Sequence, residues 1–169
     1  MNINVLKFGG TSMNDHQTWK RVLDIIRSYE YPVVVVSATA RTTRKLLEAG
    51  KLAAGGDLTG AKKIAEEIYD RHYELVKNFL DENPHKKNQL ILESCDKKLD
   101  EKTGLLKKYL DYTAKTGSLE PKMSDAIASI GEQISSYLLA QCGLALDILT
   151  QQNEAKKLIK TDHQYGSAN

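Results

Sequence analysis

The order of secondary-structure signals at the start of the chain constrains the fold more than any other feature. Residues 3–8 (INVLKF) are β-prone and stop at two glycines, and residues 32–37 (PVVVVS) form a second run that is apolar without alternation. Such a run is typical of a strand covered on both faces of a parallel sheet. Between the two runs, apolar residues recur at the spacing of one helix face: Trp19, Val22, Leu23 and Ile26. This β-α-β order predicts an α/β fold with a parallel sheet.

The middle of the chain predicts a helical hairpin. Asn14 or Asp15 is expected to cap the first helix, and Asp57 a later one. The later helix has an apolar stripe that Pro84 ends: Ala61, Ile64, Ala65, Ile68, His72, Leu75, Val76 and Phe79. A second long helix has its own stripe: Leu92, Cys95, Leu99, Leu106 and Tyr109. The two stripes can face each other, with His72 packed in the core or at its rim rather than acting as a ligand or base.

The last third predicts a helix over residues 122–142, a buried strand over 144–150 and a further short strand over 157–161. The chain contains no internal repeat and no second domain, so we treat residues 1–169 as part of one domain. Its turn-rich end would leave an edge of the sheet open, which indicates an incomplete architecture.

Composition excludes several classes of function. The 169 residues carry a formal net charge of only +2, with basic and acidic residues interleaved, so we expect no nucleic-acid or membrane partner. The two cysteines and four histidines lack metal-ligand spacing, which predicts free thiols and no metal site. The sequence has neither the apolar core of a signal peptide nor a membrane-spanning run, so a cytoplasmic location is expected.

Three segments could carry chemistry. The first, Lys7-Phe8-Gly9-Gly10-Thr11-Ser12, lies between a predicted strand and a helix. Glycines let the backbone approach an anion, N–H groups before a helix point at it, and a lysine adds positive charge. This pattern suits a phosphate site, although a plain strand-to-helix turn with an exposed lysine would read the same way.

The second and third segments are weaker signals. Residues 37–44 (SATARTTR) follow the second strand, so they would share a sheet edge with the glycines, or they could simply cap the next helix. In residues 129–136 (SIGEQISS), Ser129, Glu132 and Ser136 lie on the helix face opposite to the apolar one. Glu132 could bind the amine of a ligand there, although a solvated polar face is the simpler interpretation.

Together, in this order, the segments resemble the aspartate kinases of the amino acid kinase family. Residues 7–12 resemble the signature KFGGTS, residues 37–39 with 43–44 the second-strand segment, and 129–135 an S-x-GE-x-x-S segment. Residues 160–168 (KTDHQYGSA) are similar to the family's TD-x-x-[FY]G-x-A stretch. The resemblance implies a three-layer α/β/α sandwich around a mainly parallel sheet.

The resemblance also implies an activity: ATP- and Mg²⁺-dependent phosphorylation of the L-aspartate side chain to 4-phospho-L-aspartate. The resemblance implies that this transferase reaction is the first step of lysine, threonine and methionine biosynthesis, and that the complete enzyme is a homo-oligomer.

Residue roles follow from the same resemblance. Lys7 would contact the transferred phosphoryl group, and Gly9 and Gly10 would offer it N–H donors. The other phosphate-site positions would be Thr11, Ser12 and Ser37, with Ser37 lining the reaction centre. Thr43 and Glu132 would hold aspartate, Glu132 by pairing with its ammonium group.

Two kinds of alternative remain open. One is another kinase of the same fold that acts on glutamate, acetylglutamate, carbamate or a nucleoside monophosphate. The other is a non-catalytic α/β module that only binds an anion or a partner. The sequence lacks the family's later glycine-rich segment with an arginine and an aspartate, its adenine-binding strands and its regulatory ACT domains. We therefore interpret residues 1–169 as the N-terminal portion of one kinase domain.

This interpretation predicts that the 169-residue chain alone does not phosphorylate aspartate, because phosphoryl transfer requires both substrates to be fixed within a fraction of an ångström. The measurement is an aspartyl-hydroxamate assay with ATP and Mg²⁺, in which Lys7→Ala defines the background. Turnover above that background would contradict the prediction.

Overall fold

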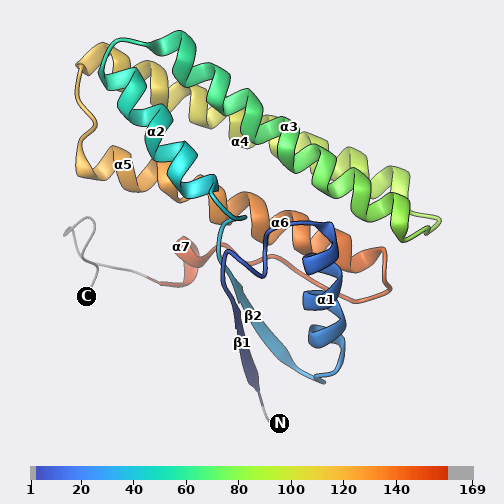
Figure 1. Cartoon of the computed structure of the whole chain (residues 1–169). Coiled ribbons are helices and arrows are strands. Elements are labelled where there is room, and N and C mark those ends of the chain that lie inside the picture. The colour runs from blue at the N-terminus through green and yellow to red at the C-terminus, as the bar shows by residue number, and fades with distance from the viewer. Residues whose placement is uncertain (1–2, 160–169) are drawn as a thin grey trace.

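The structure, a computed structural model, describes residues 3–159 and begins with two parallel strands. β1 (Asn4–Phe8) and β2 (Pro32–Val36) are joined by α1 (His16–Arg27). In the shared register Lys7 lies opposite Val35, and within the described residues the sheet has only these two strands (Figure 1). The predicted β-α-β order is confirmed, with the second strand ending one residue earlier than expected.

Asp15 begins α1, as one of the two predicted caps. Its Oδ1 accepts a hydrogen bond from the Thr18 N–H at 2.8 Å, and the Thr18 hydroxyl oxygen accepts one from the Asp15 N–H at 3.0 Å. This reciprocal capping box satisfies donors that would otherwise be free at the helix start. The predicted apolar face of α1 is buried at all four positions: Trp19, Val22, Leu23 and Ile26.

The two faces of the sheet differ in their surroundings, which corrects the expectation of a strand covered on both faces. The inward side chains pack against the core: Leu6, Phe8, Val34 and Val36. On the other face Val5, Val33 and Val35 are 68%, 50% and 48% exposed. Among residues 3–159 no helix covers that face, so these valines form an exposed apolar surface.

A helical hairpin forms the middle of the molecule, as predicted. α2 (Thr42–Ala54) leads into α3 (Leu58–Glu82) and α4 (Asn88–Thr116), which run side by side (Figure 1). Asp57 caps α3 by accepting a hydrogen bond from the Gly60 N–H at 2.8 Å. Buried side chains of both stripes, including His72 and Cys95, form the hairpin core. None of the helices in the described range combines the length and apolar composition needed to cross a bilayer.

The helix predicted over residues 122–142 is wrong as a single element. The structure divides it into α5 (Pro121–Ala128) and α6 (Ile130–Leu144), with Ser129 between them. The Ser129 hydroxyl donates to the Ala126 carbonyl at 2.9 Å and competes for an acceptor of the helix backbone, which bends helices. Beyond the break, α6 crosses the carboxyl end of the strands (Figure 1).

The two strands predicted after this helix are also wrong. Residues 145–150 form a turn and an irregular segment in which Asp147 has a φ of 57° and Leu149 is 98% exposed. Thr150 folds back onto α6, its hydroxyl donating to the Ala140 carbonyl at 2.6 Å. The described part of 157–161 includes the end of a one-turn helix, α7 (Ala155–Leu158). A strand needs a partner strand to accept its backbone hydrogen bonds, and none lies beside these segments in the described residues.

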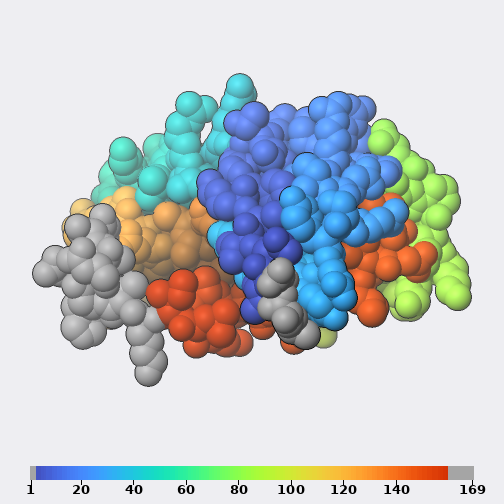
Figure 2. Space-filling model, turned by 90° about the horizontal axis from the view of Figure 1, so that it is seen from below, coloured from blue at the N-terminus to red at the C-terminus, as the bar shows by residue number. Residues whose placement is uncertain are grey.

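The molecular surface reflects this arrangement. Seen from below in Figure 2, the N-terminal strands and α1 (blue) reach the surface, with the segment around α7 (red) to one side of them. The helical hairpin lies on the far side of α6 from the strands, and α6 is the helix that lies across the carboxyl end of the sheet (Figure 1).

Gly131 provides a stability test of how α6 packs on the rest of the chain. A Cβ added at Gly131 would lie 2.8 Å from the Ala38 Cβ, whereas one at Gly104 of α4 would meet nothing within 4 Å. We expect Gly131→Ala to destabilise the chain by about 1–3 kcal/mol, because a packed neighbour must move. The control Gly104→Ala should stabilise it by roughly 0.5–1 kcal/mol, because alanine favours a helix. Urea unfolding measures the change in the free energy of unfolding for both variants. Equal changes would refute the close approach of Gly131 to Ala38.

Candidate active site

Two loops follow the parallel strands and meet at one edge of the sheet. We call residues 9–15, between β1 and α1, the glycine loop, and residues 37–41, between β2 and α2, the serine loop. The Ser37 N–H donates to the Phe8 carbonyl at 3.0 Å, which extends the ladder to the beginning of both loops. A Cβ at Gly10 would lie 3.6 Å from the Ala38 carbonyl oxygen, so the loops are in contact. The expectation that both segments share one edge is therefore confirmed.

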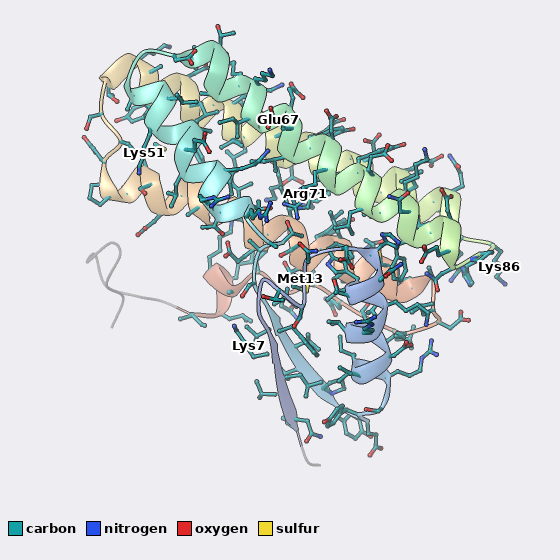
Figure 3. All side chains as sticks on the ribbon, viewed as in Figure 1. Lys7, Met13, Lys51, Glu67, Arg71 and Lys86 are labelled. Atoms are coloured by element: carbon teal, nitrogen blue, oxygen red, sulfur yellow. The ribbon has the colours of Figure 1, made fainter. Side chains whose placement is uncertain are left out.

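Lys7 precedes the glycine loop and lies on the exposed side of β1 (Figure 3). Its Nζ is 3.5 Å from where a Cβ on Gly9 would stand, so the ammonium group lies close to the loop backbone. Among residues 3–159 it forms no ion pair and donates no hydrogen bond. Its charge is therefore available to an anion beside Gly9. Of the two other candidate residues in this loop, Thr11 is exposed and Ser12 is half-buried.

The N-terminus of α1 itself is not free to bind an anion. Asp15 already accepts the Thr18 N–H, and this backbone hydrogen bond is the main reason why the pKa of the Asp15 carboxyl lies below its usual value. The Asp15 carboxylate therefore already takes the place at the start of α1 that a bound anion was expected to fill. An anion cradle here depends on the N–H groups of the glycine loop.

The serine loop is fixed by a chain of buried side chains. The Thr39 and Thr42 hydroxyl oxygens are 2.5 Å apart, and the Thr39 hydroxyl oxygen is 2.8 Å from the Nε2 of His72. The His72 Nδ1 is 2.6 Å from the Ile68 carbonyl, which can only accept, so Nδ1 carries the proton and Nε2 accepts from Thr39. Burial lowers the pKa of His72 to about 4, so the ring is neutral at neutral pH.

α6 brings Glu132 to the same edge. Gly131 packs against Ala38 of the serine loop, and the Ser135 hydroxyl donates to the Ser37 carbonyl at 2.9 Å. Glu132 lies between these two contacts and is half-buried. Within the described residues its carboxylate forms no ion pair and accepts no hydrogen bond. A carboxylate held at the site without a partner is suited to a cationic group of a ligand.

The two serines predicted to frame Glu132 are engaged elsewhere. The Ser129 hydroxyl bonds the Ala126 carbonyl, and the Ser136 hydroxyl donates to the Glu132 carbonyl at 2.7 Å and accepts from the Gln152 amide at 2.7 Å. Thr43 is half-buried in the first turn of α2, and its hydroxyl has no hydrogen bond within the described chain. Ser37, which is half-buried, Thr43 and Glu132 are thus the predicted site residues of these two segments whose side chains have no hydrogen-bond or ion-pair partner within the described residues.

Other predicted features have simple outcomes. Cys95 and Cys142 are free and buried, which agrees with the expected thiols. Burial raises the pKa of the Cys95 thiol to about 12, so neither reactivity nor metal binding is favoured. Residues 3–159 hold no group of three or more His, Cys, Asp or Glu that could bind a metal ion. The KTDHQYGSA segment, residues 160–168, lies outside the described residues.

Sequence reasoning missed two residues at this edge, Arg41 and Arg71. Arg41 is the N-cap of α2 with a φ of 69°, a conformation in which a side chain other than glycine is strained. Arg71 of α3 donates to backbone carbonyls of both loops. No periodicity signal marks either residue, because one depends on a backbone dihedral angle and the other on a tertiary contact.

Comparison with known proteins identifies the family. The model of the amino acid kinase family matches residues 2–165. The chain belongs to the amino acid kinase family. It is 30% identical over 164 residues to the chloroplastic aspartokinase 1 of Arabidopsis thaliana, covering 94% of this chain and 26% of that protein.

Solved structures agree with this assignment. Escherichia coli aspartokinase III in complex with lysine and aspartate superposes with a TM-score of 0.78 at 25% identity, over 99% of this chain and 34% of that one. The same enzyme in complex with aspartate and ADP gives a TM-score of 0.77. The chain therefore has the amino acid kinase α/β fold, and it spans about a quarter to a third of the length of these proteins.

The strained dihedral at Arg41 yields a stability prediction. Replacing Arg41, with its φ of 69°, by glycine removes the steric penalty of the left-handed region, so Arg41→Gly should stabilise the chain by about 1 kcal/mol. Arg44 lies in the first turn of α2 with helical geometry, and Arg44→Gly should destabilise the chain by roughly 0.5–1 kcal/mol. Urea unfolding of the two variants provides the comparison. A loss of stability in Arg41→Gly would contradict the strain argument.

Proposed function

We propose that this chain supplies the aspartate site and one side of the phosphate site of an aspartate kinase. The observation that carries the proposal is the meeting, at one sheet edge, of an unpaired lysine beside a glycine loop and an unpaired glutamate on α6. The lysine suits an anionic phosphate, and the glutamate suits a cationic ammonium group. The alignment with an aspartokinase, which covers 94% of this chain, supports this choice of substrates.

The proposed chemistry needs little from the protein beyond placement and charge. The side-chain carboxylate of aspartate is ionised at neutral pH and attacks the γ-phosphorus of ATP directly, so no general base is required. The bond from that phosphorus to the oxygen bridging the β- and γ-phosphates breaks, and ADP leaves with the electron pair. Two anions in contact repel by several kcal/mol at an effective dielectric of about 20, so positive groups must offset that repulsion.

In this scheme Lys7 and the N–H groups of Gly9 and Gly10 neutralise the transferred phosphoryl group, with Thr11 and Ser12 beside them. Ser37 lines the point at which both substrates meet. Thr43 and Glu132 hold the amino acid, Glu132 through its ammonium group. Mg²⁺ would enter with the phosphates of ATP and add charge neutralisation, because the described residues offer no cluster of carboxylates to hold it separately.

The open face of the sheet fits the same proposal. Val5, Val33 and Val35 leave an apolar surface that a second helical layer would bury, which would complete a three-layer α/β/α sandwich. Residues 1–169 would then form the N-terminal portion of one kinase domain, since the relatives are about three to four times longer. Strands for the adenine ring would come from the remaining length.

The decisive test is Glu132→Gln in an enzyme of full kinase length that carries residues 1–169. A charge-assisted hydrogen bond contributes on the order of 1.5–3 kcal/mol, so the KM for aspartate should rise roughly 10- to 150-fold. The KM for ATP should change far less, because the ammonium group belongs to the amino acid. Steady-state kinetics with both substrates varied separates the two effects.

The matched control is Glu48→Gln, which removes an exposed carboxylate on α2 that has no ion-pair partner in the described residues. It should leave both KM values unchanged. An unchanged aspartate KM in Glu132→Gln, or a defect confined to ATP, would refute the proposed role. If the unmutated enzyme of full kinase length phosphorylates another amino acid but not aspartate, the chain belongs to a different kinase of the same fold.

A further inference from the structure

The two loops of the candidate site have few direct links to each other. Beyond the hydrogen bond from Ser37 to Phe8, the ladder ends and the backbones diverge into α1 and α2. The glycine loop carries the proposed phosphate donors, and the serine loop leads to Thr43. The distance between them sets how the two substrates would meet, so whatever fixes that distance matters to the reaction.

Arg71 of α3 joins the two loops through one guanidinium group. Its Nη1 donates to the Ala40 carbonyl at 2.5 Å, and its Nη2 donates to the Asn14 carbonyl at 3.4 Å. Figure 3 shows Arg71 extending from α3 toward the loop that contains Met13. The guanidinium presents its donors in a rigid planar fork, whereas a lysine ammonium is a compact charge on a flexible stem, so lysine is not an equivalent replacement.

The next residue, His72, fixes the serine loop from the same turn of α3. Its buried Nε2 accepts from the Thr39 hydroxyl, and Thr39 is linked in turn to Thr42 at the start of α2. Thr42 precedes Thr43, so this chain of hydrogen bonds determines the path of the backbone on which Thr43 is carried. Both ring nitrogens of His72 are satisfied within the protein, which leaves it no role as a base.

Arg71 has no carboxylate partner in residues 3–159. Burial, together with the nearby charge of Arg41, lowers the pKa of the Arg71 guanidinium from its usual high value. Retaining a half-buried arginine whose only bonds are to two loop carbonyls costs desolvation energy that a neutral residue would avoid.

We propose that Arg71 and His72 are positioning residues that set the spacing between the glycine loop and the serine loop. They act through backbone and hydroxyl contacts and do not touch substrate. The helical hairpin is thus the support that aligns the two halves of the site. The expected effect on the rate of catalysis rests on the proposed kinase function. The expected effect on amide exchange in the two loops does not.

The first experiment measures amide hydrogen exchange in the 169-residue chain. In Arg71→Met, which keeps an unbranched side chain, the amides of residues 9–15 and 37–41 should exchange at least about 10-fold faster, because their local opening is no longer opposed. Amides around Cys95 and Leu99 in the hairpin core should be unchanged. Asp70→Asn, at an exposed neighbouring position on α3, is the control and should match the parent chain.

His72 allows a rescue test. Glutamine can place an acceptor near the position of Nε2, whereas leucine cannot, so His72→Gln should retain slow exchange in residues 37–41 and His72→Leu should lose it. Arg71→Lys should slow exchange in at most one of the two loops. Unchanged loop exchange in Arg71→Met, or equal acceleration throughout the chain, would overturn the proposal, the latter because it indicates only a general loss of stability.

The second readout is kinetic, in an enzyme of full kinase length. Misplacement by about 1 Å can cost on the order of 100-fold in rate, so Arg71→Met should lower kcat by about 10- to 100-fold. Both KM values should change by less than about 3-fold, because each half-site stays intact. A large rise in one KM would overturn the proposal, since it would indicate direct substrate contact. If Glu132→Gln has no effect while the exchange results hold, the proposed kinase function fails and the positioning role remains.

Discussion

The parallel pairing of β1 with β2 is the constraint on which the rest of the site depends. Parallel strands cannot be joined by a tight turn, so α1 must return the chain to the starting edge. Both carboxyl ends then lie together, with Phe8 opposite Val36 and the two loops emerging side by side. This places a lysine and two glycines next to a segment rich in hydroxyl groups. The strands themselves supply only the direction in which the loops leave.

Helices that come later in the sequence convert this edge into a defined site. α6 approaches closely enough that only glycine fits at position 131, and it bonds the end of β2 through Ser135. α3 contributes Arg71 and His72 from one turn. The helices α3 and α6, which are far apart in sequence, thus meet at residues 37–42. Such contacts cost conformational entropy to form, and they persist because apolar burial around them is extensive.

The charges of the molecule are distributed unevenly. Along the hairpin, lysines face carboxylates in exposed pairs such as Lys45 with Glu67 and Lys62 with Asp111, both at 2.7 Å. Pairs of this kind contribute little to stability. At the sheet edge Lys7 and Glu132 also have no such partners among the described residues, and they differ from other unpaired charges in lying beside the glycine and serine loops. That position, rather than the lack of a partner alone, is why this edge carries the functional proposal.

Elements whose signals are local could be predicted from the residues alone. Asp15 and Asp57 cap their helices through neighbouring N–H groups, and the hairpin stripes follow the 3.6-residue period, so these predictions held. The same local signals failed for residues 144–150, where an apolar run indicated a strand, because a strand also requires a partner. The division of the helix at Ser129 goes with a local hydrogen bond to Ala126, which the apolar periodicity did not reveal. That one sheet face stays open and that Arg71 links two loops was decided by tertiary structure, because both depend on which distant atoms are close in space and no periodicity encodes that distance.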